Sequence, residues 1–345
     1  TQGNDKLFLN KGDFEFEDIS SKAGIDNHIG VKTGVNFLDI NQDGWIDIYV
    51  CRAGWSKNES DRKNLLFINQ KDNSFIESAD RFGLADPNCS IQSTSFDYDG
   101  DGDLDLFVSN HPQIFNERML DLLAKTENPP DESTSHLYRN DGNDHFTDVT
   151  YEAGLESYTY GLGILSADFN NDGWTDLYTT SDFAPRDHYY INQKDGTFTE
   201  SLEEYFPHCS YFAMGIDMVD INQDQSLDIF VDEMLAEDNK RQKTNMAPMD
   251  MERFNILSEN GMHFQYMRNS FFVNSGNGHF SDVAPYAGID KSDWSWSCLF
   301  GDYDLDGDDD LIIANGWLKD TQDKDFNKKS NKLAAESNNQ LTFDV

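Results

Sequence analysis

The sequence predicts an all-β fold, a β-propeller of four-stranded antiparallel blades. Three observations predict it. An acidic loop occurs five times, an apolar segment typical of a strand follows each copy, and pairs of short aromatic strands joined by Gly/Asn/Asp turns lie between the copies. A unit of strand, acidic loop, strand, connection, strand, tight turn and strand, repeated around a circle, makes a propeller.

The acidic loop is clearest between Asp97 and Asp105, where carboxylates stand at loop positions 1, 3, 5 and 9 and Gly102 stands at position 6. In the EF-hand, calcium is bound by oxygens at alternate loop positions and by the backbone carbonyl at position 7, and glycine allows the sharp turn at position 6. Here the last acid comes at position 9, and the flanking segments are predicted strands. The loop therefore predicts a Ca²⁺ site between the first two strands of a blade.

One such loop could equally be a solvated acidic turn, but five copies that each lead into an apolar strand favour bound calcium, up to five ions. The fourth copy has Gln225 where the others have glycine, which predicts the weakest site because this position requires a positive φ. The expected ligands, with the backbone oxygen serving at position 7, are Asp39, Asn41, Asp43, Trp45 and Asp47; Asp97, Asp99, Asp101, Asp103 and Asp105; Asp168, Asn170, Asp172, Trp174 and Asp176; Asp220, Asn222, Asp224, Ser226 and Asp228; and Asp302, Asp304, Asp306, Asp308 and Asp310.

An aromatic hairpin accompanies the loops as a second repeat. A short strand that ends in Asn leads through a Gly/Asn/Asp turn into a strand that begins with Phe, and many copies then close with Ala-Gly-Ile or Ala-Gly-Leu. The hairpins lie at 7–16, 66–75, 137–149, 189–198 and 271–283. The first strand of each unit, 161–165 for example, is rich in small residues, which suits a crowded innermost strand.

We expect the propeller to occupy residues 1–318 and a polar tail residues 319–345, with a surface helix at 325–336. The expected units are a half blade at 5–20, blades at 21–80, 81–150, 151–203 and 204–288, and a half blade at 289–318. The two halves can pair to close a ring, or the units can belong to a larger propeller, and the sequence leaves both open.

The formal net charge of −38 opposes binding to phosphate backbones, so nucleic acid is a poor partner. With 37% hydrophobic residues and 25 Phe the chain has enough apolar surface for real cores. The cysteines Cys51, Cys89, Cys209 and Cys298 show no CxxC spacing and are expected as small buried hydrophobes in preference to disulfides. No apolar run approaches the length of a membrane helix.

Strand alternation predicts two different faces of the disc. The calcium loops and the hairpin turns share one face, and the other receives the insertions 52–64, 110–136, 181–188 and 232–270. The last insertion is rich in methionine and carries Arg241, Lys243, Arg253 and Arg268, which we expect to contact a partner. The alternative is that this insertion plugs the channel or packs on a neighbouring blade.

The sequence contains no zinc motif of the His-Glu-x-x-His kind, no Gly-x-Ser-x-Gly elbow and no phosphate-binding glycine loop. Trp294 and Trp296 share one face of a predicted strand, where they either pack in the core or stack on a sugar ring. Two functions remain: a non-enzymatic calcium-stiffened module that binds a protein or glycan, or a calcium-dependent polysaccharide-acting enzyme, lyase or glycosidase, because acid pairs are abundant.

These loops and hairpins resemble the FG-GAP/VCBS repeat proteins, calcium-binding propellers of the integrin α type that include the cartilage-acidic-protein-like group. The segments 237–244, 265–269 and 293–296 are similar to long bacterial surface lipoproteins of this family. The resemblance implies about seven blades, and a secreted or surface location, with outer-membrane anchoring through a part not in this chain. It also implies an accessory role in an outer-membrane nutrient-uptake complex of the starch-utilisation type.

Overall fold

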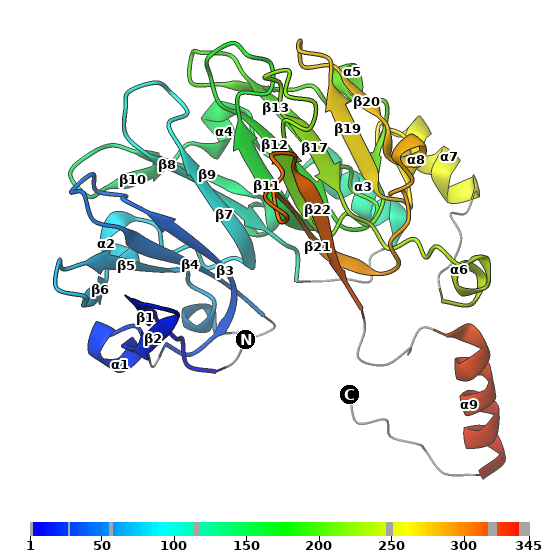
Figure 1. Ribbon diagram of the computed structural model, residues 1–345, viewed down its shortest axis with the longest axis horizontal. Coiled ribbons are helices and arrows are strands. Elements are labelled where there is room, and N and C mark those ends of the chain that lie inside the picture. The colour runs from blue at the N-terminus through cyan, green and yellow to red at the C-terminus, as the bar shows by residue number, and fades with distance from the viewer. Residues whose placement is uncertain are drawn as a thin grey trace.

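The computed structural model describes residues 3–26, 28–54, 58–113, 118–245, 251–316 and 323–337. The fold is mostly β, and its sheets follow one another along an arc in the order of the sequence (Figure 1). Four sheets have four antiparallel strands each, and in each of them the strand order is the order of the chain. The prediction of an all-β propeller with four-stranded antiparallel blades is therefore confirmed.

The four complete blades agree in the lengths of their third and fourth strands, and the first two strands are shorter in the fourth blade than in the others. The first consists of β3 (Val31–Leu38), β4 (Asp47–Ala53), β5 (Leu65–Asn69) and β6 (Phe75–Glu77). The second consists of β7 (Ser90–Phe96), β8 (Asp105–Asn110), β9 (His136–Asn140) and β10 (Phe146–Asp148). The third consists of β11 (Gly161–Ala167), β12 (Asp176–Ser181), β13 (His188–Asn192) and β14 (Phe198–Glu200). The fourth consists of β16 (Ile216–Val219), β17 (Asp228–Val231), β19 (Ser270–Asn274) and β20 (Phe280–Asp282).

Two further antiparallel sheets have two strands each, β1 (Phe8–Gly12) with β2 (Glu15–Asp18), and β21 (Ser295–Gly301) with β22 (Asp310–Asn315). The first of them packs through Leu7 and Leu9 on Ile48 and Phe67 of the first blade. The second lies against β16 of the fourth blade. Within the described residues these two sheets do not pair with each other.

The innermost strands β3, β7, β11, β16 and β21 contact one another in succession, and small residues permit the close approach. A Cβ on Gly34 would lie 2.5 Å from the carbonyl oxygen of Ile91 in the next blade, and a Cβ on Gly215 would lie 2.8 Å from Cα of Ser297. The small residues expected on the first strand of each unit are thus a packing requirement between neighbouring blades.

A short helix follows the last strand of most units, and its ends explain two sequence repeats. These helices are α1 (Ser20–Ala23), α2 (Ala79–Phe82), α4 (Thr150–Ala153), α5 (Leu202–Tyr205) and α8 (Ala284–Ala287). The acid that ends the strand accepts the first N–H of the helix, as Asp282 does from Ala284 at 2.9 Å. The glycine of the Ala-Gly pair ends the helix in the left-handed conformation, as Gly288 does at φ 75°.

Apolar side chains fill the space between adjacent blades. The cluster between the third and fourth blades is aromatic, and the rings of Phe206 and Phe280 stack with centroids 4.1 Å apart. All four cysteines are free and buried, which confirms that they behave as small hydrophobic residues.

The insertions form their own elements on the side away from the acidic loops. They contain the 3₁₀ turns Glu59–Asp61 and Asp131–Ser133, the helices α3 (Met119–Glu127), α6 (Asn239–Asn245) and α7 (Met251–Glu259), and the strand β18 (Gln265–Tyr266). β18 pairs in parallel with β15 (Cys209–Ser210), which lies in the connection between the third and fourth blades. Leu122, Ala184 and Leu257, from the insertions of the second, third and fourth blades, meet in one buried cluster with Tyr160 and Tyr211. The insertions of these three blades therefore pack on one another. A separate helix, α9 (Lys324–Ser337), follows the last sheet (Figure 1).

Candidate metal centres

The five acidic loops have closely similar internal geometry, although in the second loop the carboxylate of Asp97 accepts the N–H of Gly100 at position 4 instead of that of position 5. In the first loop, 39–47, the carboxylate of Asp39 accepts the N–H groups of Asp43 at 3.0 Å and Gly44 at 2.8 Å. The side chain of Asn41 accepts the N–H of Asp43 at 3.1 Å, and Asp43 accepts that of Trp45 at 3.0 Å. Corresponding bonds hold the side chains at positions 1, 3 and 5 of the other four loops. The backbone therefore turns the side chains at positions 1, 3 and 5 of each loop toward its interior.

This geometry requires two left-handed residues in each loop. At position 6 the left-handed residue is glycine in four loops and Gln225 in the remaining one. The φ of Gln225, 71°, agrees with the expectation from its place in the sequence. The second left-handed residue, at position 4, was missed by the sequence analysis. It is Gln42, Gly100, Asn171, Gln223 and Leu305 in the five loops. Glycine and asparagine there were a usable signal, whereas leucine gave none.

The aspartate at position 9, expected as a ligand, has a structural role first. Asp47 is fully buried, and its two oxygens accept the N–H groups of Asn69 at 2.8 Å and Ile40 at 3.2 Å. Burial raises the pKa of Asp47 to about 6 and that of Asp105 to about 7. Asp176 and Asp228 are buried and bonded in the same way to their third strands. In the fifth loop Asp310 is exposed, since no third strand covers it among the described residues.

Position 7 differs from loop to loop in its side chain. The ring of Trp174 lies against Gly100 of the second loop, where a Cβ would come within 2.6 Å of it, whereas Trp45 is half exposed. Asp103 Oδ1 is buried and has no hydrogen-bond partner among the described residues. Burial and the charge of Asp101 raise the pKa of Asp103 to about 6. An orphaned carboxylate oxygen of this kind is suited to a cation.

Two loops bring three carboxylates together, with one oxygen of each within 4.8 Å of the others: Asp97, Asp99 and Asp105 in the second loop, and Asp302, Asp304 and Asp306 in the fifth. These are the two loops with acids at all four side-chain positions. Every donor is an oxygen, so the set fits a hard cation such as Ca²⁺ in its chemistry.

Neighbouring loops touch through position 4. Gln42 Nε2 donates to the carbonyl oxygen of Gly102 in the second loop at 2.7 Å. Asn171 Nδ2 lies 3.4 Å from Ser226 Oγ, and Gln223 Nε2 lies 3.4 Å from Asp308 Oδ1. With the contact between Trp174 and Gly100, these bonds place the five loops side by side on one face, as strand alternation predicted.

The basic residues expected at a partner surface have internal contacts in three of four cases. Arg241 pairs with Asp293 at 2.5 Å, and Arg253 donates to the hydroxyl of Tyr211 at 2.8 Å. Lys243 is exposed.

Arg268 belongs to a half-buried ion cluster that the sequence did not predict. It lies 2.5 Å from Asp282, which also accepts a hydrogen bond from His208 at 2.9 Å. Burial acts to raise the pKa of Asp282, but the bonds from His208, Ala284 and Arg268 lower it to about 2. The cluster joins the 232–270 insertion to the outer strand of the fourth blade.

The two tryptophans at the start of the last sheet lie on one face, with ring centroids 6.4 Å apart. Trp294 packs beside Met214 and Met234, in agreement with core packing. Trp296 is 45% exposed and donates its Nε1–H to the carbonyl oxygen of Gly316.

Buried carboxyl groups on the insertion side serve the backbone. Glu233 accepts the N–H groups of Tyr211, Phe212 and Met234, and Asp187 accepts that of Ser181. Burial raises the pKa of Glu233 to about 8. Their bonds indicate a structural role.

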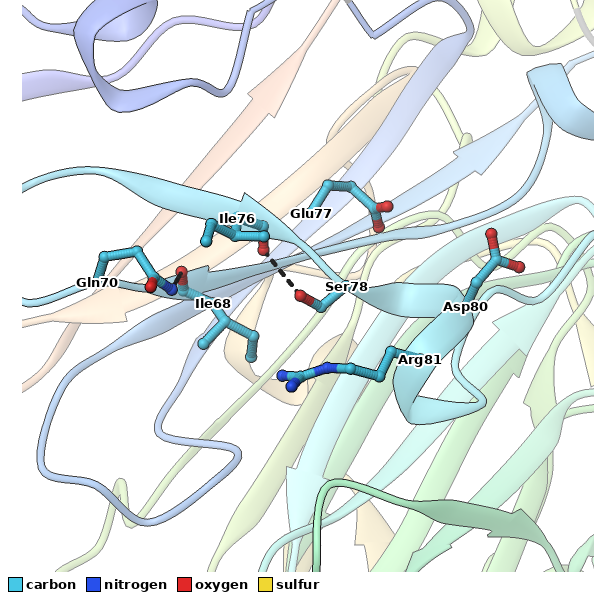
Figure 2. A pocket seen from close by; sticks show the side chains of 7 residues that line it. All are labelled: Ile68, Gln70, Ile76, Glu77, Ser78, Asp80 and Arg81. Carbon is cyan, nitrogen blue, oxygen red and sulfur yellow. Dashed lines mark hydrogen bonds between the residues drawn. The ribbon is translucent and has the colours of Figure 1, made fainter.

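The outer strands of the first blade carry an open hollow of about 450 Å³ (Figure 2). Figure 2 shows Ser78 Oγ directed at the carbonyl oxygen of Ile76, at 3.1 Å. Arg81 reaches Asp144 of the second blade at 3.4 Å, and Asp80 pairs with Lys63 at 2.6 Å. Arg81 and Asp80, two charged side chains that line this hollow, therefore already have ion-pair partners within the chain. A smaller hollow of about 120 Å³ lies between the first two acidic loops and is bordered by Gln42 and Asp103.

The fold and the loops define a class, the repeat propeller with an oxygen-lined acidic loop between the first two strands of each blade. The chain belongs to the FG-GAP-like repeat family, whose profile matches residues 39–108, 119–179, 168–231 and 260–313. All five acidic loops fall inside these matches.

Among curated proteins the chain is similar to cartilage acidic protein 1. It is 31% identical to the protein of Xenopus tropicalis over 108 residues and 25% identical to that of Homo sapiens over 176 residues. The matches cover 30% and 50% of this chain, and only 15% and 23% of the two relatives.

Solved structures with a similar arrangement include an Agrocybe aegerita lectin described as recognising non-reducing terminal N-acetylglucosamine, at 14% identity and a TM-score of 0.37, covering 90% of this chain and 79% of the lectin. Another is a rhamnogalacturonan lyase of Bacillus licheniformis, at 11% identity and a TM-score of 0.40, covering 91% and 59%. Within the described residues no helix is long and apolar enough to span a membrane.

Proposed function

We propose that this chain is a non-enzymatic calcium-binding propeller that presents a rigid surface to a protein or glycan partner outside the cell. The observation that carries the proposal is the fivefold repetition of one loop geometry on one face, with side-chain oxygens at positions 1, 3 and 5 turned inward. Repetition of this kind is expected of a site and not of a solvated turn. FG-GAP repeats often bind calcium, which agrees with this assignment.

The residues of the chain would hold the ion with the side chains at positions 1, 3 and 5, the backbone oxygen at position 7 and the acid at position 9, which in the second loop already lies beside positions 1 and 3. Calcium supplies positive charge between carboxylates that otherwise repel one another. Neighbouring loops contact each other through hydrogen bonds or, between the second and third loops, through Trp174 and Gly100, so an ion in one loop would also order the next. The ions would therefore stiffen the whole face and not only single loops.

The partner surface in this proposal is the opposite face, where the insertions pack together. Long connections on a rigid scaffold are common binding surfaces. The internal ion pairs of Arg241 and Arg268 hold the 232–270 insertion in place, and the exposed Lys243 offers a positive contact on an acidic molecule. A surface-anchored accessory of an outer-membrane uptake complex is the setting that we propose for such a module.

Calcium titration of chelator-treated protein tests the first half of the proposal. Calorimetry should show up to five ions bound, and the melting temperature should rise on adding Ca²⁺ and rise much less with Mg²⁺. At a hundredfold excess over Kd, each ion bound only to the native state adds about 2.7 kcal/mol to the free energy of unfolding. A melting temperature unaffected by Ca²⁺, with no heat of binding, contradicts the proposal.

The second half is tested with defined glycans. A panel of acidic and neutral polysaccharides immobilised on a surface, with and without Ca²⁺, should capture the chain without being cleaved. Release of oligosaccharides from the panel would favour the polysaccharide-acting enzyme instead. Capture that Lys243→Glu weakens, and that Lys11→Glu in the β1–β2 hairpin on the loop face leaves intact, would support a contact on the insertion face.

A further inference from the structure

The hairpin turns carry a lysine in two blades where the other two carry glycine. Lys71 in the first blade has φ 69° and Lys194 in the third has φ 64°, and Gly142 and Gly276 stand at the equivalent place with φ 71° and 78°. In each hairpin this residue donates its N–H to the side chain of the asparagine that ends the third strand. The backbone is the same, so lysine is used where glycine would avoid the strain of a left-handed residue.

Both lysines reach the acidic loop of their own blade. Lys71 Nζ lies 3.3 Å from Oδ2 of Asp43, the acid at position 5 of the first loop. Lys194 Nζ lies 3.4 Å from Oδ2 of Asp172, the acid at position 5 of the third loop, and 3.1 Å from its carbonyl oxygen. Oδ1 of each acid already accepts the N–H of the tryptophan at position 7. The ammonium group therefore lies at the carboxylate oxygen that a metal ion would need.

The second loop provides the comparison within the same molecule. It has acids at positions 1, 3, 5 and 9, and glycine in its hairpin turn, so no lysine side chain stands there. The first and third loops have an asparagine at position 3 and thus one carboxylate fewer. A lysine beside position 5 lowers the negative potential of these two loops further.

We propose that Lys71 and Lys194 are tethered counter-ions that compete with Ca²⁺ for the position-5 carboxylate, so that the first and third loops fill at higher calcium concentration than the second. The inference rests on the proposed calcium function. Without calcium the ammonium group holds Asp43 or Asp172 in place. When calcium binds, the lysine is displaced toward solvent, which its half-exposed position allows.

The experiment uses terbium in place of calcium, because tryptophan transfers its excitation to a nearby bound terbium ion. Trp45 and Trp174 are at position 7 of these two loops, so excitation of tryptophan reports on them. Because the ring of Trp174 also lies against Gly100 of the second loop, the signal that depends on Trp45 is the one to follow. In Lys71→Gln the terbium concentration at half saturation of the Trp45-dependent signal should fall about fivefold, the effect of removing one surface charge beside the ion. Trp45→Phe identifies that signal, and calcium competition gives the corresponding value for calcium.

Lys63→Gln is the matched control, since it removes the same charge from an exposed ion pair with Asp80 that lies outside the acidic loops. The converse variant is Gly142→Lys, which places the lysine beside the second loop. Gly142 has φ 71° and Lys71 has φ 69°, so a lysine can take the same backbone conformation there. Nothing lies within 4 Å of a Cβ added to Gly142. Calcium binding to the second loop should weaken about fivefold, with the cooperative melt of the protein retained.

An affinity in Lys71→Gln that matches Lys63→Gln, or one weaker than wild type, overturns this inference while leaving calcium binding itself intact. Wild-type protein that binds neither terbium nor calcium overturns the proposed calcium function and this inference with it.

Discussion

The side-chain amide of Asn192 donates a hydrogen bond of 2.8 Å to the carbonyl oxygen of Tyr98, which lies in the acidic loop of the preceding blade. The same amide lies 3.3 Å from the carbonyl oxygen of Thr175 in its own loop. Asn140 and Asn274 make the equivalent pair of bonds in their blades. The asparagine at the end of the third strand thus connects a hairpin, its own loop and the preceding loop.

Replacing Asn192 with alanine should therefore destabilise the junction of two blades. The change removes both amide bonds and leaves the buried carbonyl oxygen of Tyr98 and the N–H of Lys194 without a partner, at an expected cost of about 2–4 kcal/mol. Urea unfolding measures the loss. Gln193→Ala is the control, since that side chain is exposed and, among the described residues, bonds only to the carbonyl oxygen of Ile191 two positions earlier. Equal stability of the two variants would show that the amide does not join the blades.

The acid at position 9 and the acid at position 3 should respond differently to the same substitution. Asp105 accepts the N–H groups of Tyr98 and Asn140 with its two oxygens, so Asp105→Asn turns one acceptor into a donor. We expect a loss of about 2–3 kcal/mol of unfolding free energy even in chelator. Asp99→Asn places at position 3 the asparagine that three other loops have there. It should therefore weaken calcium binding to the second loop and leave the metal-free stability unchanged. A metal-free stability equally low in both variants would contradict this division.

The fourth loop should improve when its left-handed residue becomes glycine. Gln225 has φ 71°, a conformation that costs a non-glycine residue about 1 kcal/mol. Gln225→Gly should raise the free energy of unfolding by that amount and tighten cation binding to the loop. Gly173→Gln in the third loop, which has φ 87° and open space around the Cβ, should have the opposite effect. Chemical denaturation and calcium titration of the two variants measure their stability and their calcium affinity. Effects of the same sign in the two variants would contradict this prediction.

Gln225 and Leu305 mark how far the sequence could predict the loops. Position 6 was predictable because glycine recurs there and its absence in the fourth loop is visible. Position 4 was predictable only where glycine or asparagine occupies it, because Leu305 is left-handed only as a result of loop closure, against its own preference.

The strands, the order of the blades and the two faces of the disc could be predicted from the sequence, because each unit repeats the same local pattern of loop and hairpin. The contacts of the insertions did not, because they depend on tertiary structure. The charges of Arg241, Arg253 and Arg268 indicated an exposed basic patch. Their partners Asp293, Tyr211 and Asp282 come from other elements, and no local signal connects them.

The buried pair of His136 and Asp86 should give the stability a measurable pH dependence. His136 Nδ1 lies 2.9 Å from Asp86 Oδ2, which also accepts bonds from Tyr138 and Asn110. Burial acts to lower the pKa of His136, but its bond to Asp86 and that charge raise it above 6.5. Burial likewise acts to raise the pKa of Asp86, but His136 and the other donors lower it below 3.8.

A histidine whose pKa is raised on folding contributes stability that is complete below its unfolded pKa and is lost as the pH rises through the folded value. The contribution of His136 should therefore be present at pH 6 and disappear above neutrality. The lowered pKa of Asp86 has the opposite effect. Its contribution to stability is present at neutral pH and is lost as the pH falls below about 4. In His136→Gln the fall in unfolding free energy between pH 6 and pH 9 should be smaller than in wild type. His145→Gln, a change at an exposed histidine, should retain the wild-type profile. Urea unfolding at both pH values measures the difference, and a wild-type slope in His136→Gln would show that the pair does not ionise in the folded protein.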